Sequence, residues 1–216
     1  HTLSLHDALP ISPLWWKGQK AYDVVPTTHF CMGGVATDKW GATSLTGLFA
    51  VGEVSAGAHG ANRLGGNALA EVFSMGSLAG EKAAEMAKNL ESPAPLAQAA
   101  GNEKIRLEGM FSSEGTRPKQ LIQALKEQMW HKVGISRIGN DLEDALTIIR
   151  GPWACAAVEN PAALIRLLEF QNMRLVAEMV CRAALERTES RGSHFRADYT
   201  DEDNSQWLKN ILLRKG

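Results

Sequence analysis

Apolar residues at helical spacing dominate the second half of the chain. Between residues 67 and 88 they recur every three or four positions, which predicts one long helix. After a proline-containing stretch at 90–101, the same spacing predicts a short helix over 102–111 and then three longer helices. The last of these, from 161 to about 187, is the longest. We expect the three to form an antiparallel bundle with short connections.

Residues with known preferences for helix ends mark several boundaries. Thr116 stands before Pro118 and is predicted to cap a helix that ends at Gly134. Asn140 is followed three positions later by a glutamate, which is the spacing of a capping box at the start of the next helix. Asn160, directly before a proline, is predicted to open the longest helix.

The first part of the chain has a different pattern, in which short apolar or β-branched runs alternate with glycines. Residues 23–26 and 48–51 are typical of short strands, and Gly52 ends the second. The run HFCMGGVATD contains paired glycines, which indicate a turn or a close backbone approach. Gly76 and Gly80 would each destabilise an isolated helix by roughly 1 kcal/mol. We therefore expect another backbone to pack against that face of the first predicted helix.

These patterns divide the chain into three ranges. We interpret residues 1–21 as an artefact or junction, because residues 2–11 resemble a translated sequencing adapter. The origin of residues 12–21 stays open. Residues 22–90 are predicted to form an α/β part, and residues 101–216 an all-α three-helix bundle followed by an irregular tail.

Composition and charge exclude several classes of protein. The net charge is -1 at pH 7, so no basic field indicates binding to nucleic acid or to a membrane surface. Charged residues interrupt the apolar runs well before the length of a membrane span. Cys31, Cys155 and Cys181 lack the spacing of metal ligands and are expected to be buried thiols in a reducing compartment.

The segment with the clearest chemistry reads GLFAVGEVSAGAHGANRLGGNALAE. A predicted buried strand runs into a glycine-rich loop, and the loop runs into a helix. Such a loop brings backbone N–H groups and a helix N-terminus close to an anionic or electron-rich group. The segment has neither the GxGxxG order of a dinucleotide fingerprint nor the GK[ST] of a phosphate loop. Spacing alone therefore predicts only a ligand near a helix N-terminus.

Three segments resemble the flavoprotein subunits of succinate dehydrogenase and fumarate reductase. They are VPTTHFCMGG, GLFAVGE with HGANRLGGNALAE, and ALERTESRGSHFRADYTDEDNSQWLKN, and the resemblance covers residues 24–210. It implies that residues 22–90 are the C-terminal part of an FAD-binding domain and carry substrate-site segments. Residues 101–216 would then be the helical C-terminal domain. The expected fold class is an α/β remnant of a flavin-binding domain followed by an all-α three-helix bundle with an irregular tail.

The resemblance also implies roles for particular residues. His29 and Arg63 match the pair that holds a substrate carboxylate in this family. The residues implied to bind FAD are Glu53, Asn67, Ala68 and Leu69. Arg63 can grip a carboxylate with two parallel N–H donors, and His29 can add another. The helix that starts beside this pair would stabilise negative charge on the reduced flavin.

The implied reaction interconverts succinate and fumarate by hydride transfer at flavin N5. In the family an arginine of a mobile cap domain donates the proton. No segment matches that cap, the N-terminal dinucleotide fingerprint or the histidine that links FAD covalently in some members, and we expect all three upstream of residue 22. We therefore expect an N-terminally truncated fragment that is inactive and binds FAD weakly. No proton donor and no metal ligand are assigned.

Two alternatives stay open. L-aspartate oxidases share all three segments, although they and the membrane-bound complexes usually have one residue more between the positions of Glu53 and Arg63. The other alternative is a non-catalytic helical module that docks a partner subunit. For the enzyme we expect a small dicarboxylate substrate and, as partner, an iron–sulfur or other electron-transfer subunit. The expected location is the cytoplasm, or the inner face of the membrane through that partner.

Two further groups of polar residues give weaker signals. His59 is predicted to brace the loop rather than to bind substrate. The tail contains a basic cluster of Arg191, His194 and Arg196. We favour a solvated tail in which the cluster pairs with nearby acids, namely Asp198, Asp201 and Glu202. The alternative, that the tail packs near the site or on an electron-transfer partner, stays open.

Overall fold

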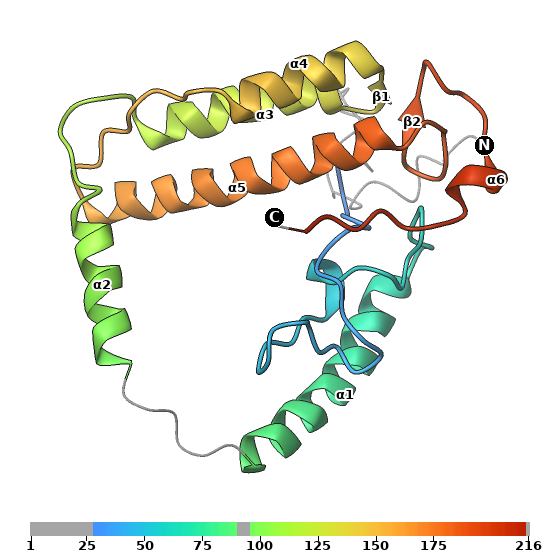
Figure 1. The fold of residues 1–216 in the computed structure, drawn as a ribbon, viewed down its shortest axis with the longest axis horizontal. Coiled ribbons are helices and arrows are strands. Elements are labelled where there is room, and N and C mark those ends of the chain that lie inside the picture. Colours follow the sequence, from blue (N-terminus) through green and yellow to red (C-terminus); the bar gives the residue numbers. More distant parts are fainter. Residues whose placement is uncertain (1–27, 90–95, 215–216) are drawn as a thin grey trace, which may run out of the picture. The chain divides into compact units, whose positions relative to one another are not determined.

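The computed structural model describes residues 28–89 and 96–214. The chain divides into two compact units, His1–Cys31 and Met32–Gly216, and every helix and strand in Figure 1 that carries a label belongs to the second. The predicted strand at 23–26 and the range 1–21 lie outside the described residues.

Helices make up most of the regular structure of the second unit (Figure 1). The elements in chain order are η2 (Gly52–Val54), α1 (Asn67–Asn89), α2 (Ala97–Glu108), α3 (Pro118–Val133), β1 (Ser136–Arg137), α4 (Gly139–Arg150), α5 (Pro161–Glu186), β2 (Phe195–Arg196) and α6 (Asn204–Trp207). In the described residues, β1 and β2 are the only sheet, a parallel pair with Arg137 opposite Arg196.

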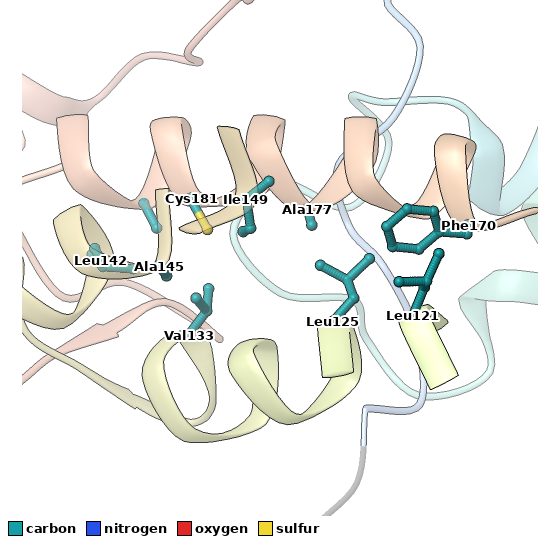
Figure 2. Close-up of a cluster of buried hydrophobic side chains, with 10 residues drawn as sticks. Leu121, Leu125, Val133, Leu142, Ala145, Ile149, Phe170, Ala177 and Cys181 are labelled. Carbon is teal, nitrogen blue, oxygen red and sulfur yellow. The ribbon is translucent and has the colours of Figure 1, made fainter. Parts of the chain in front are cut away.

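Helices α3, α4 and α5 pack together and confirm the predicted three-helix bundle (Figure 1). Their apolar residues recur every three or four positions, so each helix presents one buried stripe to the other two. Figure 2 shows these side chains meeting between the helices: Leu121, Leu125, Val133, Leu142, Ala145, Ile149, Phe170, Ala177 and Cys181. The Trp153 ring adds an edge-on contact to Phe170, with 5.0 Å between the ring centroids.

Two of the helix boundaries predicted at the bundle are confirmed. Asn160 caps α5, and its side-chain Oδ1 accepts from the Ala163 amide at 2.9 Å. Gly134 is the C-cap of α3, as its position after the last apolar residue predicts. Local sequence signals therefore set the start of α5 and the end of α3.

Two other predicted caps are wrong, because contacts distant in sequence take their place. Thr116 is not the cap of α3, which begins after Arg117. The Thr116 amide instead donates to the Cys155 carbonyl at 2.8 Å, which holds its backbone in an extended bridge. Asn140 lies inside the first turn of α4, and the carboxylate of Asp198 accepts from the Gly139 amide at 2.8 Å. A residue from the tail thus caps this helix.

The α/β part contains less regular structure than its pattern predicts. The predicted strand at 48–51 forms a single bridge, in which Phe49 pairs with Ala42. Helix α2 starts at Ala97, so the second part of the predicted 90–101 linker is helical, and it ends at Glu108 rather than at 111. None of the α2 residues is buried. The predicted short helix is therefore present as α2, but it begins and ends closer to the N-terminus than the predicted range 102–111.

Helix α1 has nearly the predicted length and packs on η2. Its buried residues are Glu71 and Ala79. A Cβ atom at Gly76 or Gly80 would meet nothing within 4 Å in the part of the chain that the structure describes. The backbone packing predicted for this face is therefore not formed among the described residues.

Two of the three cysteines differ from the prediction of buried thiols. Cys31 and Cys155 are exposed, and only Cys181, on the inner face of α5, is buried. Cys155 and Cys181 are free thiols. Within the described residues, no helix is both long enough and apolar enough to cross a membrane.

Candidate functional site

The predicted site segment forms a loop of residues 55–66, called the site loop below, between η2 and α1. Its start is held against the segment that contains the paired glycines. The Val35 amide donates to the Val54 carbonyl at 2.8 Å, and the Ala56 amide donates to the Val35 carbonyl at 3.0 Å. A Cβ atom at Gly34 would lie 2.3 Å from the Val54 oxygen, so only glycine fits there. The predicted close backbone approach is confirmed at Gly34.

His59 braces the site loop from the side of α1. Its Nε2 lies 2.7 Å from Glu71 Oε2, and only 6% and 7% of the two side chains is exposed. The Ser55 hydroxyl also donates to the same carboxylate, at 3.4 Å. This geometry agrees with the prediction that His59 is structural, because its imidazole already pairs with Glu71 of α1.

Glycines give the site loop an open backbone. Gly57, Gly60 and Gly66 have φ angles of 121°, 54° and 83°, in the region that favours glycine. Among the described residues, none of the three has a neighbouring atom within 4 Å of an added Cβ. Among the described residues, space therefore lies beside the loop backbone at these three glycines, and a bound group such as the predicted flavin could fill it.

Arg63 lies at the end of the site loop and is half-buried. Its Nη1 donates to the Leu64 carbonyl at 3.4 Å, a long bond. The Asn67 amide donates to the same carbonyl at 3.2 Å and starts α1. The structure thus places the predicted substrate arginine next to the predicted flavin-facing helix start.

Large apolar side chains surround the start of α1 and are exposed to solvent. They are Leu64, Leu69, Val72 and Phe73, whose exposed fractions range from 45% to 75%. Exposed apolar residues in such a group mark a surface that binds another group or chain. Leu69 is one of the residues that the resemblance implies to bind FAD through the backbone of this turn, and that role stays a prediction.

The other predicted site residues have separate positions. Glu53 lies in η2 and is exposed. Asn67 and Ala68 form the first turn of α1. His29 is exposed and belongs to the unit His1–Cys31, whereas Arg63 belongs to Met32–Gly216. The convergence of His29 and Arg63 on one carboxylate stays a prediction.

The C-terminal tail supplies a contact to the site loop that the sequence did not predict in detail. The amide and the hydroxyl of Ser193 both donate to the Ala61 carbonyl, at 3.1 and 3.2 Å. Gly192 has a φ of 59°, and a Cβ there would lie 2.3 Å from the Ala61 oxygen. The signal that could have indicated this contact is the glycine of SRGSH, which stands among four hydrogen-bonding side chains.

Glu189 organises the start of the tail. It is fully buried and accepts from Arg187 at 2.6 Å and from Arg191 at 2.8 and 2.9 Å. The Asp203 amide donates to it at 2.8 Å. Hydrogen bonds from Arg191, from that amide and from Arg187 lower the pKa of Glu189 to about 2, although burial opposes them. The carboxylate is therefore ionised and fully paired at neutral pH.

The favoured interpretation of the tail as a solvated segment is wrong, although two of its predicted ion pairs, Arg196 with Asp198 and Arg191 with Glu202, are formed. Arg196 is only 2% exposed, and its guanidinium donates to the Ala184 and Leu185 carbonyls at the end of α5. It also forms two bonds of 2.8 Å with Asp198, which hold the pKa of that carboxyl well below its usual range. The predicted pairing with Asp198 is present, but it fixes the tail onto the bundle, because the last carbonyls of a helix need donors.

His194 links the tail to two further parts of the bundle. Its Nδ1 lies 2.9 Å from Arg137 Nη1, and its Nε2 lies 3.2 Å from the Arg187 carbonyl. Burial lowers the pKa of His194, and nearby guanidinium groups lower it further. A neutral imidazole satisfies both contacts, since Nδ1 accepts from the arginine and Nε2–H donates to the carbonyl.

No group of three or more histidine, cysteine or carboxylate side chains within the described ranges is arranged to hold a metal ion.

Comparison with known proteins identifies the class. Residues 122–216 match the family described as "Fumarate reductase flavoprotein C-term", and residues 14–69 match the family described as "FAD binding domain". The second match begins inside the range interpreted above as an artefact or junction. The chain belongs to the FAD-dependent flavoprotein family that includes the flavoprotein subunits of fumarate reductase and succinate dehydrogenase, and L-aspartate oxidase.

Particular relatives cover most of this chain. A fumarate reductase (CoM/CoB) subunit of Methanothermobacter marburgensis is 40% identical over 200 residues, which are 89% of this chain and 36% of the relative. The fumarate reductase flavoprotein subunit of Haemophilus influenzae is 34% identical, over 88% of this chain and 34% of the relative. L-aspartate oxidase of Rhodospirillum rubrum is 38% identical, over 85% and 60%.

Solved structures of the same family have a similar fold. Mycobacterium smegmatis Sdh1, in complex with UQ1, aligns with a TM-score of 0.74 at 36% identity, over 81% of this chain and 31% of that one. Escherichia coli quinol fumarate reductase FrdA aligns with a TM-score of 0.74 at 33% identity, over 84% and 34%. The chain therefore spans about a third of the length of most relatives that it matches.

Proposed function

We propose that this chain is part of an FAD-dependent oxidoreductase that interconverts succinate and fumarate. The observation that carries the proposal is the position of Arg63. Its guanidinium is half-buried at the end of an open glycine-rich loop, directly before the first turn of α1. A fixed cation beside a helix N-terminus favours a small dianion there, since both contribute positive charge.

For the substrate, the proposal assigns Arg63 and His29 to one carboxylate. A guanidinium can donate two parallel N–H bonds to a planar carboxylate, and such charge-assisted bonds are about twice as strong as neutral ones. An imidazole N–H adds a third donor. Holding the carboxylate out of the plane of the double bond would polarise the adjacent carbons. The residue that moves the proton is not assigned.

For the cofactor, the proposal assigns Glu53 and the first turn of α1, which contains Asn67, Ala68 and Leu69. FAD, when bound, supplies the acceptor and donor of the two electrons. The positive end of the 23-residue helix α1 would stabilise the added negative charge of the reduced state. The exposed apolar side chains Leu69 and Phe73 would be covered by the bound group or its domain.

For a partner, the proposal is an iron–sulfur or other electron-transfer subunit, and a peripheral location at the inner face of the membrane through it. The outer side of α5 supports such a contact, because Ile165, Leu175 and Val176 are each at least 50% exposed. If the helical part only docks a partner, the Arg63→Ala variant of the complete protein would retain that partner, and wild type would turn over no dicarboxylate.

The main alternative within the family is L-aspartate oxidase, which the similarity to the Rhodospirillum rubrum protein favours. The experiment that decides is an assay of the complete flavoprotein, loaded with FAD, on succinate, fumarate and aspartate. Turnover of succinate and fumarate would support the proposal. Turnover of aspartate alone would replace it with the oxidase.

A further inference from the structure

Residues distant from the substrate arginine in sequence lie against its loop. The site loop contains Ala61, two positions before Arg63. The carbonyl oxygen of Ala61 accepts two hydrogen bonds from Ser193, at 3.1 Å from its amide and 3.2 Å from its hydroxyl. These bonds span 132 residues of sequence. They join the site loop to the tail of the helical domain.

The backbone of the tail approaches the site loop so closely that a side chain does not fit. A Cβ atom on Gly192 would lie 2.3 Å from the Ala61 oxygen, 2.5 Å from its carbonyl carbon and 2.8 Å from its Cβ. All three distances are shorter than real Cβ contacts, and two of the three atoms are backbone, which cannot rotate away. The positive φ of Gly192 adds a second reason for glycine.

The part of the tail that makes this contact is itself firmly held. Arg191 and His194 exchange two backbone hydrogen bonds of 2.8 and 3.0 Å, which close a tight turn around Gly192 and Ser193. The side chain of Arg191 pairs with the buried carboxylate of Glu189. Ser193 therefore donates from a turn that side-chain contacts attach to the end of the bundle.

One flank of that turn, His194, is held at the ends of both α3 and α5. His194 contacts Arg137, whose Nε donates to the Val133 and Gly134 carbonyls at the end of α3. His194 also contacts the carbonyl of Arg187, the C-cap residue directly after α5. The site loop is thus held from two sides, by His59 on Glu71 and by the tail on Ala61. A glycine-rich loop can adopt many conformations, so contacts on both sides are needed to hold it in one of them.

We propose that Gly192 and Ser193 are positioning residues for Arg63, and that through them the helical C-terminal domain sets the affinity of the site for its dicarboxylate. This inference rests on the proposed function of Arg63. The bonds to Ala61 fix the backbone two positions before the arginine, so the guanidinium approaches the substrate in one orientation. Neither residue touches the substrate, and their effect passes through the loop.

The decisive variant is Gly192→Ala in the complete flavoprotein with FAD, compared with Gly47→Ala. Gly47 has a φ of 85°, as unfavourable for alanine as that of Gly192, but a Cβ there meets nothing within 4 Å of the described chain. Gly47→Ala therefore reproduces the backbone strain without the collision. Two quantities are measured, which are amide hydrogen exchange in peptides that cover residues 57–66 and the KM for the dicarboxylate that wild type turns over.

The expected result for Gly192→Ala is faster exchange at residues 57–66 and a KM raised by about tenfold or more, since misplacing a substrate-positioning group has large effects. Gly47→Ala should leave both at the wild-type value, and both variants should keep their FAD. Unchanged exchange in Gly192→Ala, or faster exchange with an unchanged KM, would overturn the inference.

If Gly192→Ala does not fold, the test uses Ser193→Ala instead. We expect its KM to rise roughly twofold to fivefold, because one hydrogen bond to the loop is lost. An unchanged KM in that variant would overturn the inference.

The exchange measurement also separates this inference from the function on which it rests. If wild type turns over none of succinate, fumarate and aspartate, the proposed function fails. Faster exchange at residues 57–66 in Gly192→Ala would still show that the tail fixes the loop, but the inference about dicarboxylate affinity would be overturned with it.

Discussion

His59 Nε2 lies 2.7 Å from Glu71 Oε2, and this pair joins the site loop to the first turns of α1. Both side chains are more than nine-tenths buried, so the contact forms in a dry environment where partners are costly to remove. The loop that carries Arg63 is therefore built onto the helix whose N-terminus faces the proposed flavin.

Removing the carboxylate of Glu71 should loosen the site loop and destabilise its surroundings. In Glu71→Ala we expect a loss of about 1–3 kcal/mol in the free energy of unfolding, because the imidazole of His59 loses a buried partner. Urea denaturation monitored by circular dichroism measures this. Glu85→Ala is the matched control, since it removes an exposed ion pair with Lys82 from the same helix. Equal losses in the two variants would contradict the role of the buried pair.

Among the side chains of the tail, Glu189 should cost the most stability when it is substituted. Glu189→Gln leaves Arg187 and Arg191 without their shared anion, and breaking such a buried pair costs about 3–5 kcal/mol. Guanidinium denaturation of wild type and variant measures the difference. Glu103→Gln serves as the control, because its pair with Arg106 is solvent-exposed. If Glu189→Gln were as stable as this control, the tail would not depend on the network.

Acid should lower the free energy of unfolding because Glu189 becomes protonated. The pKa of Glu189 is about 2 in the folded chain, against a usual value of 4.5, so the unfolded chain binds its proton more readily. The contribution of Glu189 is therefore complete above about pH 4.5 and is lost as the pH falls toward 2. The unfolding free energy measured in steps from pH 6 to pH 2.5 should decline, and this decline should be smaller in Glu189→Gln. Parallel curves for the two proteins would contradict the assignment.

The thiols of Cys155 and Cys181 should differ in reactivity toward alkylating agents. Cys181 is fully buried against α3 and α4, and burial raises its pKa to about 11, so the thiolate that reacts with alkylating agents is scarce at pH 8. Cys155 is exposed. Iodoacetamide at pH 8 followed by peptide mass spectrometry should label Cys155 within minutes and leave Cys181 unlabelled until urea is added. Labelling of Cys181 at the rate of Cys155 would contradict the packing of the bundle.

The three-helix bundle could be predicted from sequence because it is governed by local periodicity. Leu121 and Leu125 on α3, or Leu142 and Ala145 on α4, follow the helical repeat, and each repeat shows which face is buried. Asn160 likewise caps the residues directly after it. Short-range patterns of this kind need no knowledge of the rest of the chain.

The caps that were predicted wrongly depend on contacts distant in sequence. Asp198 caps α4 across 59 positions, and Thr116 pairs with the segment around Ala156 rather than with its own helix. The spacing of apolar residues does not predict contacts between residues so distant in sequence. In the same way, the buried position of Arg196 could not be read from a segment that is otherwise polar.

The sequence indicated candidate site residues but not the contacts that hold their loop in place. The glycine-rich segment and its resemblance to a flavoprotein family indicated Arg63 and the start of α1, and the structure places the two next to each other. The hydrogen bonds from Ser193 to Ala61 depend on how the tail returns to the loop, which spacing does not determine. His29 lies in the other compact unit, so its role beside Arg63 stays a prediction.

The central claim is that Arg63 holds a dicarboxylate, and the most direct measurement is kcat/KM for fumarate reduction by the complete flavoprotein carrying Arg63→Ala. We predict a loss of about a hundredfold or more with FAD retained, because a charge-assisted contact is worth roughly 1.5–3 kcal/mol and the variant also loses its orientation. Arg166→Ala, which removes an exposed cation paired with Glu169, should match wild type. A kcat/KM for Arg63→Ala equal to that of Arg166→Ala would contradict the role of Arg63.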